Sequence, residues 1–243
     1  MTDAAPTFVL CVPRSGSTLL RLFLDSHPDT ACPPETNFAL VVARLEEHVA
    51  RTFHADGDAG AAITIRLARE VAGETLGEYA RLRGKRRWAE KSLTSLEHAD
   101  ALYRCFPDAR FVCLVRECRD TIVSMLEASP YGLAGLGLPT YAERHPTNTV
   151  AACAEMWADR VSAMLTFEAN RPRACLRVRY EDMVRRPAET MSGLCRFLDL
   201  EWIEDLLSPE TLLDPSRQTG YGGDAKVWYR TPFDPSLIGR GLR

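Results

Sequence analysis

Lysine is scarce in this chain. The 243 residues include 30 basic side chains, of which only Lys85, Lys91 and Lys226 are lysines. Because arginine is the default cation here, a lysine that persists suggests a need for a compact, rotatable ammonium group. Lys91 and Lys226 fall in the motifs described below. Lys85, between Gly84 and Arg86, is expected to be a solvated charge in a turn.

Membrane-spanning and export signals are also missing. No apolar run reaches the roughly 18 residues that suggest a membrane span. The first residues, Met-Thr-Asp-Ala-Ala-Pro-Thr, have neither the basic nor the apolar region of a signal peptide. The formal net charge of −3 argues against nucleic acid or an anionic membrane as a partner. We therefore expect a soluble, cytoplasmic protein whose partners are small or carrier-borne molecules.

Cysteine pairs with metal-ligand spacing are absent. The cysteines occur singly, at positions 11, 32, 105, 113, 118, 153, 175 and 195, without C-x-x-C spacing or His-rich neighbours. Such a pattern predicts no zinc site. Several of these cysteines lie within apolar patterns, where cysteine behaves as a small hydrophobic residue. A reducing compartment is the expected setting.

The chain has no G-x-x-x-x-G-K-[ST] pattern, whose lysine and hydroxyl bind phosphates and magnesium in nucleoside triphosphatases. Instead, an apolar run over residues 8–12 leads into Pro13-Arg14-Ser15-Gly16-Ser17-Thr18-Leu19 and a leucine-rich segment. This order predicts a strand, a loop and a helix N-terminus. The N–H groups of residues 15–18, the helix dipole and Arg14 would together bind a phosphate or sulfate. The alternative is an ordinary strand-to-helix turn with Ser17 as N-cap.

Alternating strand and helix patterns predict the fold. Strands are expected at 8–12, 86–90, 111–115 and 174–180, with helices after most of them. The pattern indicates an α/β fold: a P-loop-like parallel sheet flanked by helices, as a single domain over residues 1–243. Arg14, Lys91 and Arg116 each follow a predicted strand, so they should converge where such sheets bind ligands.

Two further segments carry expectations of their own. A helix is predicted over 148–170, with a core face formed by Val150, Ala154, Trp157, Val161, Met164 and Leu165. Residues 129–147 form an apolar loop rich in Gly and Pro that is too long for a simple connector. This loop is either a lid over an acceptor or a surface excursion.

Four segments together resemble the sulfotransferases that use 3′-phosphoadenosine 5′-phosphosulfate (PAPS). The resemblance extends from about Phe8 to Arg240. Residues 13–19 are similar to the loop that binds the 5′-phosphosulfate, which implies binding roles for Arg14, Ser15, Gly16, Ser17, Thr18 and Leu19. Arg116 and Ser124 match the Arg-x₇-Ser pair that binds the 3′-phosphate. Tyr180 opens a Y-E-D-M stretch, and the tail over 214–240 resembles the segment that closes over the donor, with Lys226 aimed at phosphate.

Two branches of that family are most similar. The P-R-S-G-[ST]-T-L loop, Asp25-Ser26-His27-Pro28 and Glu35-Thr36 resemble the tyrosylprotein type, whose catalytic base is the Glu that matches Glu35. This chain departs from that branch, because Pro34 stands where the branch has a second acidic residue and neither membrane anchor nor lumenal disulfides are found. The tail also resembles bacterial sulfotransferases of secondary metabolism. The acceptor hydroxyl could therefore belong to a small molecule, a carrier-bound intermediate or a tyrosine.

The resemblance implies transfer of a sulfuryl group from PAPS to an acceptor hydroxyl, with release of 3′-phosphoadenosine 5′-phosphate (PAP). Glu35 would be the base, and burial in the crevice would raise its pKa. Lys91, with Arg14, would stabilise charge on the leaving oxygen. No metal is required, because Arg and Lys supply the positive charge.

Several alternatives stay open. His27, His98 and His145 are other candidate bases, with His145 foremost and His27 more typical of a helix C-cap. Arg116 could instead pair with Glu117 or Asp120. At the level of function, the alternatives are a P-loop phosphotransferase resembling a kinase and a non-catalytic protein that binds PAP or PAPS.

Overall fold

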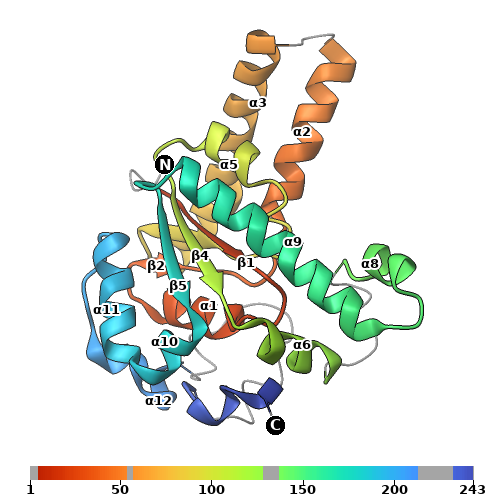
Figure 1. Cartoon of the computed structure of the whole chain (residues 1–243). Coiled ribbons are helices and arrows are strands. Elements are labelled where there is room, and N and C mark those ends of the chain that lie inside the picture. The colour runs from red at the N-terminus through yellow and green to blue at the C-terminus, as the bar shows by residue number, and fades with distance from the viewer. Residues whose placement is uncertain (1–4, 54–56, 128–136, 213–231, 243) are drawn as a thin grey trace.

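A computed structural model of the chain describes residues 5–53, 57–127, 137–212 and 232–242 (Figure 1). All strands are parallel and form one sheet in the order β2-β3-β1-β4-β5. They are β1 (Thr7–Cys11), β2 (Thr30–Ala31), β3 (Arg87–Glu90), β4 (Arg110–Val115) and β5 (Cys175–Arg179). The predicted α/β fold class is confirmed. Only β2 was missed, because two residues are too few to give a periodic pattern.

The central strand β1 separates two apolar layers. It pairs with β4 from Thr7↔Arg110 to Cys11↔Leu114, and all its residues are buried. Because side chains alternate along a strand, Phe8 and Leu10 enter one core cluster, whereas Val9 and Cys11 enter the other. Two buried faces explain why the strand reads as a continuous apolar run.

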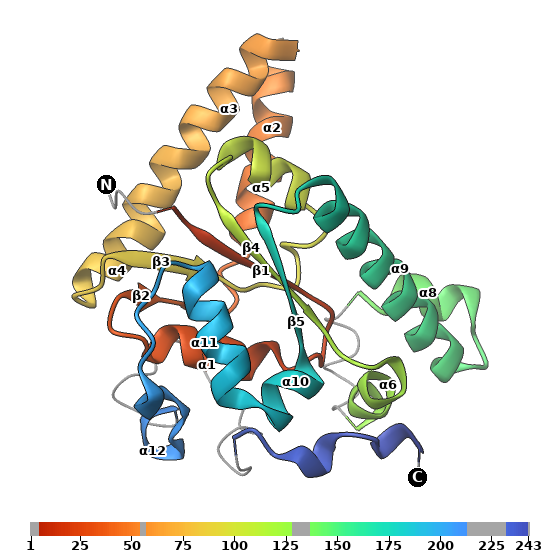
Figure 2. The same cartoon turned by 60° about the vertical axis from the view of Figure 1, so that its left-hand side comes forward.

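Helices cover both faces of the sheet (Figures 1 and 2). One core cluster receives α2 (Phe38–Phe53), α3 (Gly57–Ala72), the π-helix η1 (Gly73–Gly77), α4 (Glu78–Leu82), α5 (Ala99–Cys105), α6 (Cys118–Leu126) and α9 (Thr149–Asn170). The other receives α1 (Ser17–Ser26), α10 (Tyr180–Arg185), α11 (Pro187–Phe197), η2 (Glu204–Leu207) and α12 (Pro209–Leu212). The α2–α3 hairpin extends away from the carboxyl ends of the strands (Figure 1). Among the described residues, no helix combines the length and apolar character that a bilayer crossing requires.

Helix α9 matches the predicted range, and its predicted core face is right for Met164 but wrong for Val150 and Leu165. Val150 is 52% exposed and Leu165 is 36% exposed. The buried residues are Ala152, Cys153, Met156, Arg160, Met164 and Phe167. Arg160 also lies on the buried face, where it donates to the Leu93 carbonyl (3.3 Å) and to Glu97 Oε1 (2.5 Å). Ala154, Trp157 and Val161 are only partly buried beside the core.

Two irregular segments are described in part. Of the predicted lid over 129–147, residues 129–136 lie outside the described residues, and the remainder contains the short helix α8 (Pro139–Arg144). Of the tail, residues 232–242 are described and include the 3₁₀ turns η3 (Pro235–Leu237) and η4 (Arg240–Leu242). This C-terminal segment lies beside α6 and α10 at the carboxyl ends of the strands (Figures 1 and 2). The prediction of one domain over residues 1–243 stays a prediction.

Candidate active site

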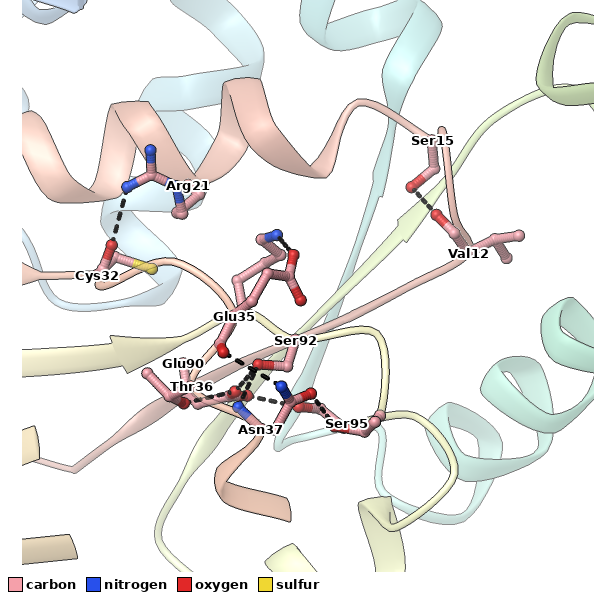
Figure 3. A network of polar contacts seen from close by, with 12 residues as sticks. Val12, Ser15, Arg21, Cys32, Glu35, Thr36, Asn37, Glu90, Ser92 and Ser95 are labelled. Carbon is pink, nitrogen blue, oxygen red and sulfur yellow. Dashed lines mark hydrogen bonds and ion pairs between the residues drawn. The ribbon is translucent and has the colours of Figure 1, made fainter. Parts of the chain in front are cut away.

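The loop after β1 is wound tightly into the start of α1. Arg14 and Gly16 both have positive φ, at 66° and 95°. The Ser15 N–H and hydroxyl both donate to the Val12 carbonyl, at 3.3 and 2.7 Å (Figure 3). Gly16, rather than Ser17, is the N-cap residue, and no side chain caps the helix. The first N–H groups of α1 therefore have no partner within the helix and can serve an anion.

Gly16 lies against Tyr180, the first residue of α10. A Cβ atom at position 16 would be only 2.4 Å from Cδ2 of the Tyr180 ring. Glycine is thus required here both by the left-handed backbone and by this contact. The Y-E-D-M stretch and the loop, more than 160 residues apart in the chain, meet at this point.

Arg14, Arg116 and Ser124 lie together at the ends of β1 and β4. Arg14 Nε donates to Ser124 Oγ (3.2 Å), and Arg116 Nη1 donates to the Arg14 carbonyl (3.2 Å). The Arg116 guanidinium carbon is 4.3 Å from the centre of the Tyr180 ring. Of the three strand-end cations predicted to converge, Arg14 and Arg116 are in contact, whereas Lys91 pairs with Glu35.

Arg116 keeps a free donor within this cluster. It is 6% exposed, and its Nη2 donates to the Leu237 carbonyl (2.8 Å). Its Nε is buried and has no hydrogen-bond partner among the residues that the structure describes. Burial lowers the pKa of the guanidinium, which nonetheless stays charged. A buried cation with an unused N–H fits the anionic end of a nucleotide.

The alternative ion pairs of Arg116 are not formed among the described residues, because both acids have other partners. Glu117 caps α6, accepting from the Asp120 N–H at 3.0 Å. Asp120 accepts from the N–H groups of Gly239 (2.7 Å) and Gly241 (2.9 Å). Asp120 thereby fastens the C-terminal segment to α6, next to Arg116.

Glu35 and Lys91 form an ion pair. Pro34 and Lys91 make a parallel bridge beyond β2 and β3, so the two side chains leave neighbouring strand ends. The Lys91 side chain is 5% exposed, whereas that of Glu35 is 47% exposed. The predicted burial of the Glu35 carboxylate is therefore wrong, because Glu35 faces both Lys91 and solvent. Glu35 also has a positive φ of 41°.

A hydroxyl network beneath this pair was missed from the sequence (Figure 3). Glu90 is fully buried and accepts hydrogen bonds from the hydroxyls of Thr36, Ser92 and Ser95. A Glu at the end of a buried strand was the available signal, because a buried carboxylate needs several donors.

The other candidate residues have different environments. His27 is buried at the end of α1, as expected of a C-cap. His145 Nε2 lies 2.6 Å from Glu155 Oε2, and His98 directly precedes α5. Ser17 and Thr18 open α1, Leu19 packs beside the core, and Lys226 lies outside the described residues.

The predicted environment of Lys85 is wrong. Rather than a solvated charge, Lys85 is 10% exposed and donates to the carbonyls of Asp25 and Thr30. It fills the corner between α1 and β2, where Asp25 is buried. Cys32 N–H in turn donates to Asp25 Oδ1 (2.8 Å), which holds the chain leading to Glu35.

All eight cysteines are free, and only Cys118 is more than marginally exposed. Burial raises the pKa of Cys11 to about 11 and that of Cys32 to about 12. These thiols therefore stay protonated beside the site.

The comparison with protein families decides the assignment. Residues 6–204 match the sequence profile of the sulfotransferase family. The chain belongs to this family. The resemblance inferred from the four motifs is therefore confirmed. The match does not support the alternative of a kinase-like phosphotransferase.

Relatives of this sulfotransferase chain include a protein-tyrosine sulfotransferase and a nodulation protein. The chain is 30% identical over 222 residues to protein-tyrosine sulfotransferase 1 of Danio rerio, covering 87% of this chain and 58% of the relative. It is 29% identical over 213 residues to the nodulation protein NoeE of Sinorhizobium fredii, covering 75% of this chain and 47% of the relative. The chain thus spans about half the length of these relatives.

Solved structures share the fold of this sulfotransferase. The sulfotransferase domain from the curacin biosynthetic pathway superposes with a TM-score of 0.69 at 24% identity, covering 98% of this chain and 90% of that domain. The sulfotransferase domain of the Synechococcus olefin synthase gives a TM-score of 0.67 at 23% identity, covering 100% and 89%.

Proposed function

We propose that this protein transfers a sulfuryl group from PAPS to an acceptor hydroxyl and releases PAP. The observation that carries the proposal is the pairing of Glu35 with Lys91 after β3, together with the cluster of Arg14, Arg116 and Ser124 after β1 and β4. A proton acceptor, a cation and a two-part anion site on one edge of the sheet are the groups that sulfuryl transfer requires. Family membership supports the choice of PAPS as donor.

The roles follow from charge. The N–H groups of residues 16–18 and Arg14 would bind the 5′-phosphosulfate, because the Ser15 N–H, also predicted for this role, donates to the Val12 carbonyl. Arg116 and Ser124 would bind the 3′-phosphate, with the unpartnered Nε of Arg116 as one donor. Tyr180, stacked on Arg116, would hold that guanidinium in place.

In the chemical step, the acceptor oxygen forms a bond to sulfur while the bond from sulfur to the bridging phosphate oxygen breaks. Glu35 takes the acceptor proton, and the leaving electron pair stays on the bridging oxygen of PAP. Lys91 would shift its ion pairing from Glu35 to that oxygen as charge develops there. Its near-complete burial strengthens such an interaction, because the local dielectric is low.

The acceptor class is proposed from the relatives. A tyrosine side chain is the first acceptor to test, because protein-tyrosine sulfotransferases match in sequence. A carrier-bound hydroxyl is the second, because the curacin-pathway domain matches in fold. A cytoplasmic, reducing setting is proposed on the eight free thiols.

The decisive experiment incubates the protein with radiolabelled PAPS and a panel of phenols, tyrosine peptides and carrier-bound hydroxyls. Transfer of label to an acceptor, with release of PAP, is the expected result. The alternative of a non-catalytic nucleotide-binding protein would be supported by tight PAP binding without transfer to any member of the panel.

A further inference from the structure

We propose that Glu90 is a positioning residue that holds Glu35 against Lys91 through Thr36. The inference rests on the proposed function for the roles of Glu35 and Lys91. Its own basis is the hydroxyl network beneath them (Figure 3).

The backbone around Glu35 is under strain. Glu35 has φ of 41° and Asn37 has φ of 51°, both in the left-handed region. For residues other than Gly this region costs about 1–2 kcal/mol each, less for Asn. Such conformations persist only where the surroundings over-determine them. The residues flanking Thr36 therefore need external anchors.

The 90–95 segment supplies those anchors. Thr36 Oγ1 donates to Glu90 Oε1 at 2.9 Å, and the Asn37 N–H donates to Ser92 Oγ at 2.9 Å. Ser92 Oγ in turn donates a hydrogen bond to Glu90 Oε1. Thr36 is thus bonded to the Glu90 carboxylate directly and Asn37 through Ser92, while Thr94 Oγ1 also donates to Asn37 Oδ1 (3.1 Å).

Glu90 has no competing partner in the described part of the chain. It is 0% exposed and forms no ion pair there. Its remaining contact is the Ser95 hydroxyl, 2.5 Å from Oε2. A carboxylate buried without a cation is costly, so the hydroxyl donors compensate for its desolvation.

Glu90 is the last residue of β3 and immediately precedes Lys91. The extended end of this strand therefore carries the cation on one residue and the anchor for the base on the preceding one. Glu90 touches neither Glu35 nor Lys91 through its side-chain hydrogen bonds. It acts by fixing the distance between them.

The test uses matched hydroxyl deletions. Thr36→Val removes the link to the base segment, Thr36→Ser retains it, and Ser95→Ala removes a hydroxyl from the same carboxylate on the side away from Glu35. We expect Thr36→Val to lower kcat with phenol by about tenfold to a hundredfold, the effect of misplacing a reacting group by about 1 Å. Thr36→Ser and Ser95→Ala should stay within a few-fold of the parent protein.

A second pair of variants, both at Glu90, separates the effect of its negative charge from that of its hydrogen-bond acceptors. Glu90→Gln keeps an oxygen for Thr36 and Ser92 and turns its amide N–H₂ toward Ser95, whose hydroxyl can rotate to accept. Glu90→Met removes every acceptor. Activity should largely survive the first change and fall with the second, while PAP affinity measured by calorimetry stays the same in both.

Two readouts distinguish positioning from simple loss of stability. With 4-nitrophenol, whose hydroxyl needs less help from a base, the Thr36→Val defect should shrink. A crystal structure of Thr36→Val should show residues 34–37 moved and the Glu35–Lys91 contact broken. An unmoved segment, or an equal loss with both phenols, would overturn the proposal. If the parent protein transfers no label at all, the proposed function fails, but the crystal structure still decides the role of Glu90.

Discussion

The ring of Tyr180 occupies the space that a side chain at residue 16 would need. The gap between a Cβ at Gly16 and the ring is only 2.4 Å, and the same ring lies beneath the guanidinium of Arg116. One aromatic residue thus sets the shape of the loop after β1, the proposed phosphosulfate site, and the position of the proposed 3′-phosphate cation.

Gly16→Ala should therefore weaken PAP binding by more than about tenfold, since a left-handed Ala costs about 1–2 kcal/mol before any clash. Calorimetric titration with PAP measures the effect. Gly193→Ala is the matched control, because a Cβ there meets nothing within 4 Å and the residue lies in α11. That change should stabilise the protein by about 0.5–1 kcal/mol. Equal PAP affinity in the two variants would contradict the contact.

Arg116→Ala should reduce PAP affinity much more than affinity for adenosine 5′-phosphosulfate, which has no 3′-phosphate. Hydrogen bonds to charged groups contribute about 1.5–3 kcal/mol, or about tenfold to a hundredfold in Kd. Arg119→Ala is a suitable control, since Arg119 is an exposed neighbour paired with Glu117. If Arg116→Ala weakened both ligands equally, Arg116 would not read the 3′-phosphate.

Glu35→Gln should lower kcat by about 10²–10⁴-fold, the loss typical of a missing general base, without changing PAP affinity. The pH dependence of kcat with phenol tests this. His145→Asn provides the comparison, because its ring is engaged by Glu155. Collapse in His145→Asn with normal activity in Glu35→Gln would transfer the role of base to His145.

Gly241→Ala should detach the C-terminal segment from α6. Its Cβ would lie 2.4 Å from Cβ and 2.7 Å from the carbonyl carbon of Arg119, and backbone atoms cannot yield as side-chain ends do. We expect faster limited proteolysis near residue 240 and weaker PAP binding, because the segment carries the Leu237 carbonyl that holds Arg116. Unchanged cleavage would show that the segment tolerates the displacement.

His27 should make stability depend on pH. Its Nδ1 accepts from the Asp29 N–H (3.1 Å) and its Nε2 lies 3.0 Å from the Glu201 carbonyl, so the folded protein holds the neutral ring. Burial lowers the pKa of His27 below 6.5. Its contribution is therefore complete above pH 6.5 and is lost as pH falls toward the folded-state pKa, because the unfolded chain binds the proton more readily.

Urea denaturation on either side of pH 6.5 measures this loss. His27→Gln should flatten the dependence. His48→Gln should preserve it, since His48 is exposed on α2. A steep dependence that survives in His27→Gln would assign it to another group.

The strands and the two strand-to-helix segments that carry Arg14 and Arg116 could be predicted because each consists of contiguous residues. An apolar strand, a small-residue turn and a helix within fourteen residues leave few arrangements open. The convergence of Arg14 and Arg116 followed from parallel topology alone.

Contacts between distant segments could not be predicted in this way. Thr36 and Glu90 are 54 residues apart, and the sequence around neither residue indicates that they form a hydrogen bond. The environment of Lys85 was predicted incorrectly for the same reason. Its sequence context is that of a turn, but it donates to the carbonyl of Asp25, 60 residues earlier. Burial of polar groups is decided by tertiary packing, which local composition does not encode.

Arg14 couples the two ends of the proposed donor site. Its Nε is held by Ser124 and its carbonyl by Arg116, although its position in the loop after β1 assigns it to the phosphosulfate. A ligand at one end of the site should therefore order Arg14, which also serves the other end. Such coupling between two binding sites is thermodynamic linkage. Pyrophosphate and adenosine 3′-monophosphate, added together, should bind cooperatively, and each should raise the affinity of the other by the same factor.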